Sequence, residues 1–170
     1  VFGEKLISEV GEQIQLLIDN AKDNALIVIE KGTYFVKAIK LKSNITLYFK
    51  KGSLFSYSTN VDDYEEIPGE VILSDGRTKQ IGTWEGDPRK MKISFLTGLD
   101  VENVDVVGEG TLDGNAQLAT WWIDHKNKPY VRPHMIFLNH CNNVNIQGIN
   151  VCNSPQWTIH PYFSKNGTLS

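Results

Sequence analysis

The sequence predicts an all-β protein that winds into a solenoid, and a short repeat is the main evidence. The repeat occurs four times, as Asn44-Ile45-Thr46-Leu47, Asn103-Val104-Asp105-Val106, Asn143-Val144-Asn145-Ile146 and Asn166-Gly167-Thr168-Leu169. Asparagine suits a tight corner because its side chain tolerates a left-handed backbone, and the alternating residues after it suit a strand with one buried face. The last two copies start 23 residues apart, within the period of stacked repeats, and the earlier gaps of 40 and 59 residues indicate inserted loops.

Length and composition limit the classes of protein that fit. The 170 residues predict a single domain over 1–170, and 41% apolar with 22% charged residues is ordinary for a folded chain. A net charge of −3 argues against a nucleic-acid partner, and without an apolar run of about 20 residues no membrane span is expected. Cys141 and Cys152 lie among strand residues and are expected to be buried small side chains. The four histidines lack ligand spacing, so we expect neither a metal nor a cofactor.

The first predicted element is an amphipathic helix over residues 7–21, with Ser8 as a candidate cap. Its apolar residues recur at helical spacing and form one face, namely Ile7, Val10, Ile14, Leu17, Ile18 and Ala21. A solenoid needs its open end covered, since the first coil otherwise exposes apolar interior and unpaired backbone groups. We therefore expect this short N-terminal helix to cap the first coil.

Strands follow the helix, and two segments interrupt them. Runs with strand character cover 25–30, 38–42, 44–49, 104–107, 111–112, 135–138, 144–146, 149–151 and 158–159. Residues 57–92 are rich in acidic residues, glycine and proline, which predicts a long insertion with a short hairpin near 71–73. A second insertion is expected at 115–131. The sequence stops at Ser170 in the middle of a coil, so we expect the N-terminal part of a longer solenoid, with the C-terminal coils missing.

Several motifs in this order resemble glycoside hydrolase family 28, the polygalacturonases and their relatives. Gly108-Glu109-Gly110-Thr111-Leu112-Asp113-Gly114 resembles the family's glycine-rich signature, and Trp121-Trp122 the tryptophan pair that follows it. Arg132-Pro133 is similar to the family's entry into the next coil. Asn153-Ser154-Pro155-Gln156-Trp157-Thr158-Ile159-His160-Pro161 closely resembles a further family segment. The match covers nearly the whole chain but only the first part of a typical family domain.

The resemblance implies a right-handed parallel β-helix that hydrolyses α-1,4 bonds of galacturonan in pectin with inversion. That reaction needs one carboxylic acid to protonate the leaving oxygen and a carboxylate to activate water, about 6.5–9.5 Å apart. The family's catalytic carboxylates lie downstream of the segment that ends here at Pro161, so we assign no catalytic residue in this chain. For a pectinase the resemblance implies secretion or a periplasmic location, while cytoplasmic action on oligosaccharides stays open.

Six residues are candidates for substrate binding, and each also has a structural interpretation. Trp121 and Trp122 offer flat faces for sugar stacking, or one of them plugs the insertion against the coil wall. Arg132 suits a galacturonate carboxylate through its planar fork, or it holds a loop through backbone carbonyls. If no bulge intervenes, strand alternation places Asn153 and Trp157 on one face and His160 on the other, and Trp157 is favoured as part of the interior. His160 hydrogen-bonds a substrate hydroxyl or caps the turn at Pro161.

Three functional hypotheses remain at this stage. The favoured one is that the chain forms the N-terminal coils of a polygalacturonase-like hydrolase, with the remaining coils of the same protein and a galacturonan substrate as its partners. The others are a non-catalytic β-helical binding or structural module and a pectate lyase-like enzyme. The insertion at 57–92 would favour exo cleavage if it walls off one end of the groove. Asp113, between Gly110 and Gly114, is expected to form a turn through its own backbone.

Overall fold

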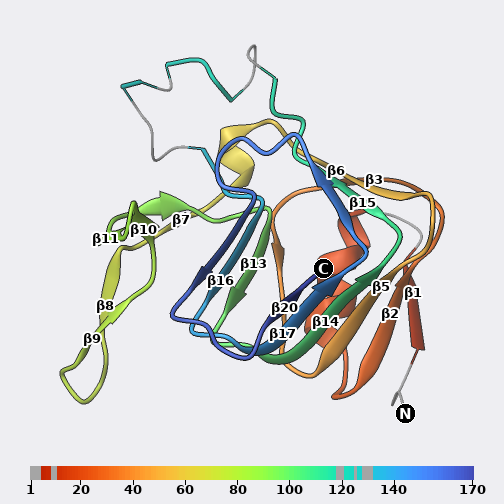
Figure 1. Cartoon of the computed structure of the whole chain (residues 1–170), viewed down its shortest axis with the longest axis horizontal. Coiled ribbons are helices and arrows are strands. Elements are labelled where there is room, and N and C mark those ends of the chain that lie inside the picture. Colours follow the sequence, from red (N-terminus) through yellow and green to blue (C-terminus); the bar gives the residue numbers. More distant parts are fainter. Residues whose placement is uncertain (1–4, 9–10, 118–120, 125, 128–131) are drawn as a thin grey trace.

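A computed structural model of the chain describes residues 5–8, 11–117, 121–124, 126–127 and 132–170. These residues form a right-handed parallel β-helix in which three parallel sheets run along the solenoid (Figure 1). Each complete coil contributes one strand to sheet A, then one to sheet B and then one to sheet C. The predicted fold class is confirmed.

Sheet A contains the repeat that was found in the sequence. Its strands are β1 (Lys5–Ser8), β2 (Ala25–Ile29), β5 (Ile45–Phe49), β14 (Glu102–Gly108), β17 (Asn142–Gln147) and β20 (Thr168–Leu169). Ile45 lies beside Val104, and Val104 lies beside Val144, so equivalent residues of successive repeats stack on one another. All three are buried, which is the alternation that the sequence predicted.

Sheets B and C close the other two sides of each coil. Sheet B contains β3 (Gly32–Val36), β6 (Ser53–Tyr57), β15 (Thr111–Asp113) and β18 (Asn150–Cys152). Sheet C contains β4 (Ile39–Lys40), β13 (Leu96–Leu99), β16 (Ile136–Asn139) and β19 (Ile159–Tyr162). Aromatic rings fill the interior between the sheets; Phe49 and Phe55 lie 4.8 Å apart, and Tyr57 stacks on Phe95 at 4.7 Å.

The repeated asparagines form the corners that lead into sheet A. Asn44, Asn103, Asn143 and Asn166 have positive φ angles of 61°, 56°, 57° and 54°. The side chains also form a ladder, in which Asn103 Nδ2 donates to Asn44 Oδ1 at 3.0 Å and Asn143 Nδ2 donates to Asn103 Oδ1 at 2.8 Å. Asn24, with a φ of 64°, forms a further corner before β2. The continuous apolar run after Asn24 hid that copy of the repeat.

The N-terminal helix is shorter than predicted. Helix α1 spans Ile14–Asn20 and follows the short 3-10 helix η1 (Gly11–Gln13). Ile7 and Ser8, predicted to begin the helix, lie instead in β1, which pairs in parallel with β2, so Ser8 is not a helix cap. Pairing with β2 hydrogen-bonds a strand edge that a helix there would leave open. Within the described part of the chain, no helix is long and apolar enough to cross a membrane.

Helix α1 still covers the first coil, as expected of a cap. Ile14 and Ile18 of α1 are fully buried in the core. The amide side chain of Gln15 accepts a hydrogen bond from the Lys40 backbone N–H at 2.7 Å and donates to the Lys40 carbonyl at 3.1 Å. This side chain therefore pairs with the first strand of sheet C as another strand would, and it protects that edge.

Two segments interrupt the coils. Between β6 and β13 lie the 3-10 helix η2 (Val61–Asp63) and the short strands β7 (Glu66–Ile67), β8 (Glu70–Ile72), β9 (Thr78–Gln80), β10 (Thr83–Trp84), β11 (Asp87–Pro88) and β12 (Met91–Lys92). Strands β8 and β9 pair as an antiparallel hairpin, which confirms the hairpin predicted near 71–73. We call residues 58–93 the first insertion; it lies outside sheet C (Figure 1). The second insertion runs between β15 and β16.

Candidate functional site

The outer face of sheet C is covered along β13 and β16 and opens at β19. Leu96 and Ile136 point into the core, so Thr97, Phe137 and Asn139 alternate with the core positions and point outward. Thr97, Phe137 and Asn139 are nevertheless only 2%, 0% and 1% exposed. The cover is therefore extensive over β13 and β16.

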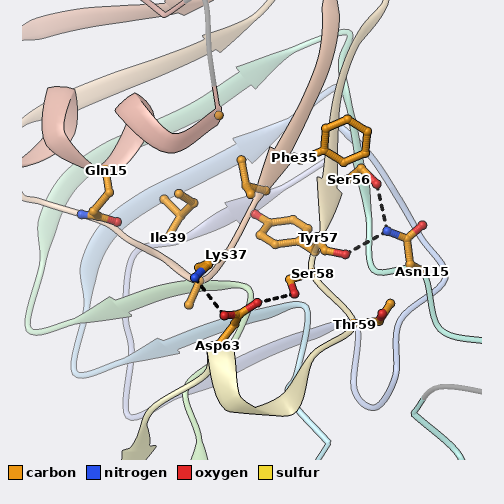
Figure 2. Close-up of a pocket in the computed structure, with 13 residues that line it drawn as sticks. Gln15, Phe35, Lys37, Ile39, Ser56, Tyr57, Ser58, Thr59, Asp63 and Asn115 are labelled. Atoms are coloured by element: carbon orange, nitrogen blue, oxygen red, sulfur yellow. Dashed lines mark hydrogen bonds and ion pairs between the residues drawn. The ribbon is translucent and has the colours of Figure 1, made fainter.

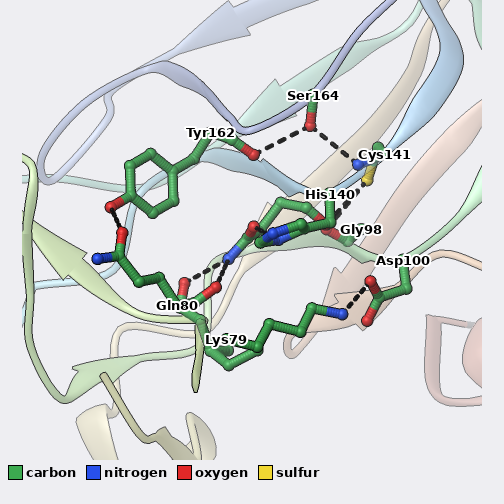
Figure 3. A network of polar contacts seen from close by, with 10 residues as sticks. Lys79, Gln80, Gly98, Asp100, His140, Cys141, Tyr162 and Ser164 are labelled. Carbon is green, nitrogen blue, oxygen red and sulfur yellow. Dashed lines mark hydrogen bonds and ion pairs between the residues drawn. The ribbon is translucent and has the colours of Figure 1, made fainter. Parts of the chain in front are cut away.

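Residues of the first insertion supply part of this cover. The Asn139 amide donates to the carbonyls of Gln80 and Ile81 at 3.1 and 2.6 Å. The Tyr162 hydroxyl donates to Gln80 Oε1 at 2.8 Å, and Lys79 forms an ion pair with Asp100 (Figure 3). Side chains from β16 and β19 thus hold the first insertion against sheet C.

A cavity of about 270 Å³ lies where this cover ends, beside β19. Its lining residues come from the first insertion, the second insertion, the segment before β16 and the segment that leads into β19, and they are Thr83, Trp84, Glu85, Trp122, Arg132, His134, Gln156, Trp157 and His160. Four of the six predicted site residues, Trp122, Arg132, Trp157 and His160, meet here although 38 residues separate the first from the last.

Arg132 carries the positive charge of the cavity. Its guanidinium lies 4.2 Å from the ring centre of Trp122, and Nη1 donates to the Pro155 carbonyl at 3.0 Å. The Nε atom is buried and has no hydrogen-bond partner among the described residues. Burial lowers the pKa of Arg132 from its ordinary value, but a guanidinium stays charged at neutral pH. Arg132 therefore holds a loop through a backbone carbonyl, as the sequence allowed, and its buried Nε–H donor remains unused.

Trp157 forms the exposed aromatic wall of the cavity. Its side chain is 52% exposed, so the prediction that it belongs to the interior stack is wrong. The Trp157 ring lies 4.7 Å from the ring of His160, so the two do not point to opposite faces as they would in an uninterrupted strand. Strand alternation does not apply here, because Asn153 has a φ of 50° and β19 begins only at Ile159. The chain turns between these residues, and the turn brings both rings to the cavity.

Trp121 and Asn153 do not reach the cavity. Trp121 is 5% exposed, packs against Tyr64 and donates from its indole N–H to the Gly114 carbonyl at 3.2 Å, so it is the tryptophan that plugs the second insertion. Asn153 is exposed at a corner, where its amide donates to Asp113 Oδ1 at 2.8 Å. The same Asp113 oxygen accepts the backbone N–H of Asn115 at 2.8 Å, which confirms the predicted turn.

The sequence interpretation did not identify His134, Trp84 or Glu85. His134 is 3% exposed, and its Nδ1 lies 3.3 Å from Nδ1 of His160. A histidine two residues after Arg132 was the available signal for it. Trp84 and Glu85 lie in the polar first insertion, where an isolated tryptophan was the only hint of a contact with the coils.

A larger cavity, of about 830 Å³, lies near the N-terminal helix and shares no lining residue with the first (Figure 2). Its main polar groups are engaged with one another. Lys37 pairs with Asp63 at 2.9 Å, Asp63 accepts from Ser58 at 2.6 Å, and the Asn115 amide donates to the Tyr57 carbonyl at 2.9 Å. None of the six predicted site residues lines this cavity, so we take the smaller one as the candidate site.

Comparisons with known proteins point to one family. A family model described as "Glycosyl hydrolases family 28" matches residues 25–170. A "Probable polygalacturonase" of Vitis vinifera is 26% identical over 149 residues, covering 86% of this chain and 28% of that relative. A "Polygalacturonase" of Ralstonia solanacearum is 26% identical over 169 residues, covering 88% of this chain and 30% of that relative. The chain thus spans less than a third of the length of these two relatives.

The fold also matches a solved structure. A hyperthermoactive exopolygalacturonase from Thermotoga maritima aligns with a TM-score of 0.73 and 20% sequence identity. The alignment covers 98% of this chain and 46% of that chain. At this level of identity the likeness shows the parallel β-helix.

Proposed function

The chain belongs to glycosyl hydrolase family 28, and on that premise we propose that it forms the N-terminal coils of a polygalacturonase. The reaction is the inverting hydrolysis of α-1,4-galacturonan in pectin. In this proposal the cavity beside β19 is one end of the substrate groove, and the catalytic carboxylates belong to coils that follow this chain. Trp122, Arg132, Trp157 and His160 are the substrate-binding residues.

The observation that carries the proposal is a cation and an open aromatic face in one cavity. Galacturonan bears a carboxylate on every sugar ring, and the guanidinium of Arg132 has a buried Nε without a partner among the described residues. A guanidinium that is partly withdrawn from water binds a carboxylate more strongly than an exposed one does. Trp157 is 52% exposed and offers a flat face to the sugar ring. The cation matches a polyuronate better than a neutral glycan, and the aromatic face suits either.

The acidic groups of the cavity support a catalytic pair located elsewhere. Inverting hydrolysis needs two carboxyl groups about 6.5–9.5 Å apart. Glu85 is the one acidic residue among the described residues that line the cavity. It is exposed, and none of the other described residues that line the cavity carries a carboxyl group. We therefore give Glu85 no catalytic role.

The first insertion favours cleavage from a chain end. It covers β13 and β16 on the outer face of sheet C, while Trp157 beside β19 is open to solvent. A polysaccharide that lies along the outer face of sheet C would meet the insertion as a wall. Such a groove accepts one end of a galacturonan chain and excludes a continuous chain, which is the arrangement needed for exo cleavage.

Binding of trigalacturonate to the chain tests the role of the cavity. We expect saturable binding by calorimetry, weakened at least about tenfold in Arg132→Gln and in Trp157→Ala, since each change removes about 1.4 kcal/mol or more. Arg132→Lys keeps the charge but loses the planar fork, and an intermediate affinity is expected. Phe35→Ala is the matched control, because Phe35 is 77% exposed and lines the other cavity. If all four variants bound trigalacturonate as tightly as the original chain does, the cavity would not be the galacturonate site.

The length of the products tests the wall. In the protein with its downstream coils, the original insertion should give short products from the first turnovers. Replacement of the β8–β9 hairpin by two glycines should lengthen the early products and speed the loss of viscosity of polygalacturonate. Unchanged product lengths would refute the exo interpretation and leave the binding result intact.

A further inference from the structure

His134 and His160 form a pair of imidazoles at the edge of the cavity. Their Nδ1 atoms lie 3.3 Å apart, and their ring centres are separated by 5.0 Å. His134 lies two residues before the start of β16 and is held by its backbone, since its carbonyl accepts the Phe95 N–H at 3.0 Å. His160 lies in β19, between the rings of Trp157 and Tyr162 at 4.7 and 5.7 Å. The pair therefore joins two neighbouring coils.

The distance restricts where the protons can be. Two Nδ1 atoms at 3.3 Å form a hydrogen bond only if one carries a proton and the other offers its lone pair. Two protons or two lone pairs at that distance would repel each other. A neutral pair is therefore made of one Nδ1–H imidazole and one Nε2–H imidazole. It follows that one of the two Nε2 atoms accepts a hydrogen bond and the other donates one.

The surroundings keep the pair neutral near neutral pH. Burial and the neighbouring His160 lower the pKa of His134 to about 3, and burial also lowers the pKa of His160. Among the described residues, the other ionisable groups that line the cavity or pack on the pair are Glu85, Arg132 and the Tyr162 phenol. Glu85 and Arg132 carry opposite formal charges, so together they do not compensate an imidazolium.

Metal binding is a weaker interpretation of the same distance. A structural or catalytic zinc site takes at least three protein ligands. Among the described residues no group of three or more histidine, cysteine, aspartate or glutamate side chains has the arrangement to hold a metal. Two imidazoles sharing one proton account for the distance without a third ligand.

We propose that His134 is a positioning residue that fixes the tautomer of His160, so that the Nε2 atom of His160 offers one defined hydrogen-bonding role to a sugar hydroxyl beside Trp157. This inference rests on the proposed function for the identity of the ligand. In this arrangement Arg132 binds the uronate carboxylate and His160 binds a hydroxyl group, while the buried His134 acts only through His160. A sugar hydroxyl can donate or accept, so it can pair with either tautomer of a neutral His160.

Long-range ¹H–¹⁵N NMR of the histidine-labelled chain tests the pairing without any ligand. At pH 7 one of the two rings should be the Nδ1–H tautomer, which is the minor form of free histidine. His134→Leu and His160→Leu each remove one partner. In whichever of these variants retains the Nδ1–H ring, that ring should return to the Nε2–H form. Finding both rings as Nε2–H in the unmodified chain, or an Nδ1–H ring that is indifferent to its partner, would overturn the proposal.

Trigalacturonate affinity tests the consequence for binding. His134→Leu should weaken binding about fivefold, the effect of one lost neutral hydrogen bond. His134→Asn keeps an amide near the Nδ1 position and should restore the affinity to within about twofold. Equal losses in both variants would mean that His134 serves only packing, which contradicts the proposal. If the unmodified chain does not bind trigalacturonate, the proposed function fails at this cavity, while the NMR result still decides whether the pair exists.

Discussion

Replacement of Asn139 by leucine should release the first insertion from the solenoid and leave the coils folded. Asn139 is 1% exposed, and its amide donates to two backbone carbonyls of the insertion, those of Gln80 and Ile81. Leucine has the same branching at Cγ and no donor. Each carbonyl belongs to a partly exposed residue, so we take the lower end of the cost of an unsatisfied acceptor, about 1 kcal/mol, and about 2 kcal/mol for the two.

Amide hydrogen exchange, measured by mass spectrometry, reports the opening of the first insertion peptide by peptide. About 2 kcal/mol corresponds to an exchange rate roughly 30-fold higher for amides that exchange through opening of the insertion. Peptides from residues 66–92 should show the increase, and peptides from β5 and β14 should not. Asn150→Leu, the same substitution at an exposed position of sheet B, is the control and should exchange like the original chain. A uniform increase over all coils, or no increase in the insertion, would refute the reasoning.

Further changes test the burial of Trp121, the packing at Gly110 and the protonation of His134. Trp121→Ala should cost about 3–5 kcal/mol in urea unfolding because it empties a buried site, whereas Trp157→Ala should change stability by less than about 0.5 kcal/mol; similar costs would contradict their different burial. Gly110→Ala should lower the urea midpoint, since a Cβ there would lie 2.4 Å from Ser53 Oγ, and an unchanged midpoint would argue against that packing. The free energy of unfolding should also fall as the pH drops from about 6.5 towards 3, by up to about 1.4 kcal/mol per pH unit. In that range the histidine is protonated in the unfolded chain, whereas burial lowers the pKa of His134 in the folded chain to about 3. Full stability from this group is present above about pH 6.5, and His134→Asn should flatten that part of the pH profile of the urea midpoint.

The regular part of the fold was predictable because its signals are local. A corner asparagine and the alternation after it are visible within four residues, and Asn44, Asn103 and Asn143 all adopt the expected left-handed backbone. The extent of the first helix was less predictable. Ile7 fits helical spacing with Ile14, yet it also fits a strand, and it forms a strand because it pairs with Val28 of β2. This pairing partner is more than 15 residues away in the sequence, so local spacing could not reveal it.

The candidate site was predictable in part. Motif order singled out Arg132, Trp157 and His160, and the structure brings them together. Alternation along a strand failed between Asn153 and Trp157 because those residues form a turn. The partner of His160 was not predictable from spacing, since His134 is 26 residues away and meets it only through the stacking of two coils.

In the proposed function these coils bind galacturonan and later coils cleave it. The release of reducing ends from polygalacturonate should be measured for the 170-residue chain, beside the longest chain that the same reading frame encodes. We expect no release by the 170 residues and release by a longer chain that carries the catalytic carboxylates, lost again when Arg132 and Trp157 are both replaced. Release by the 170 residues alone would contradict this division, because their own acidic residues would then perform the chemistry.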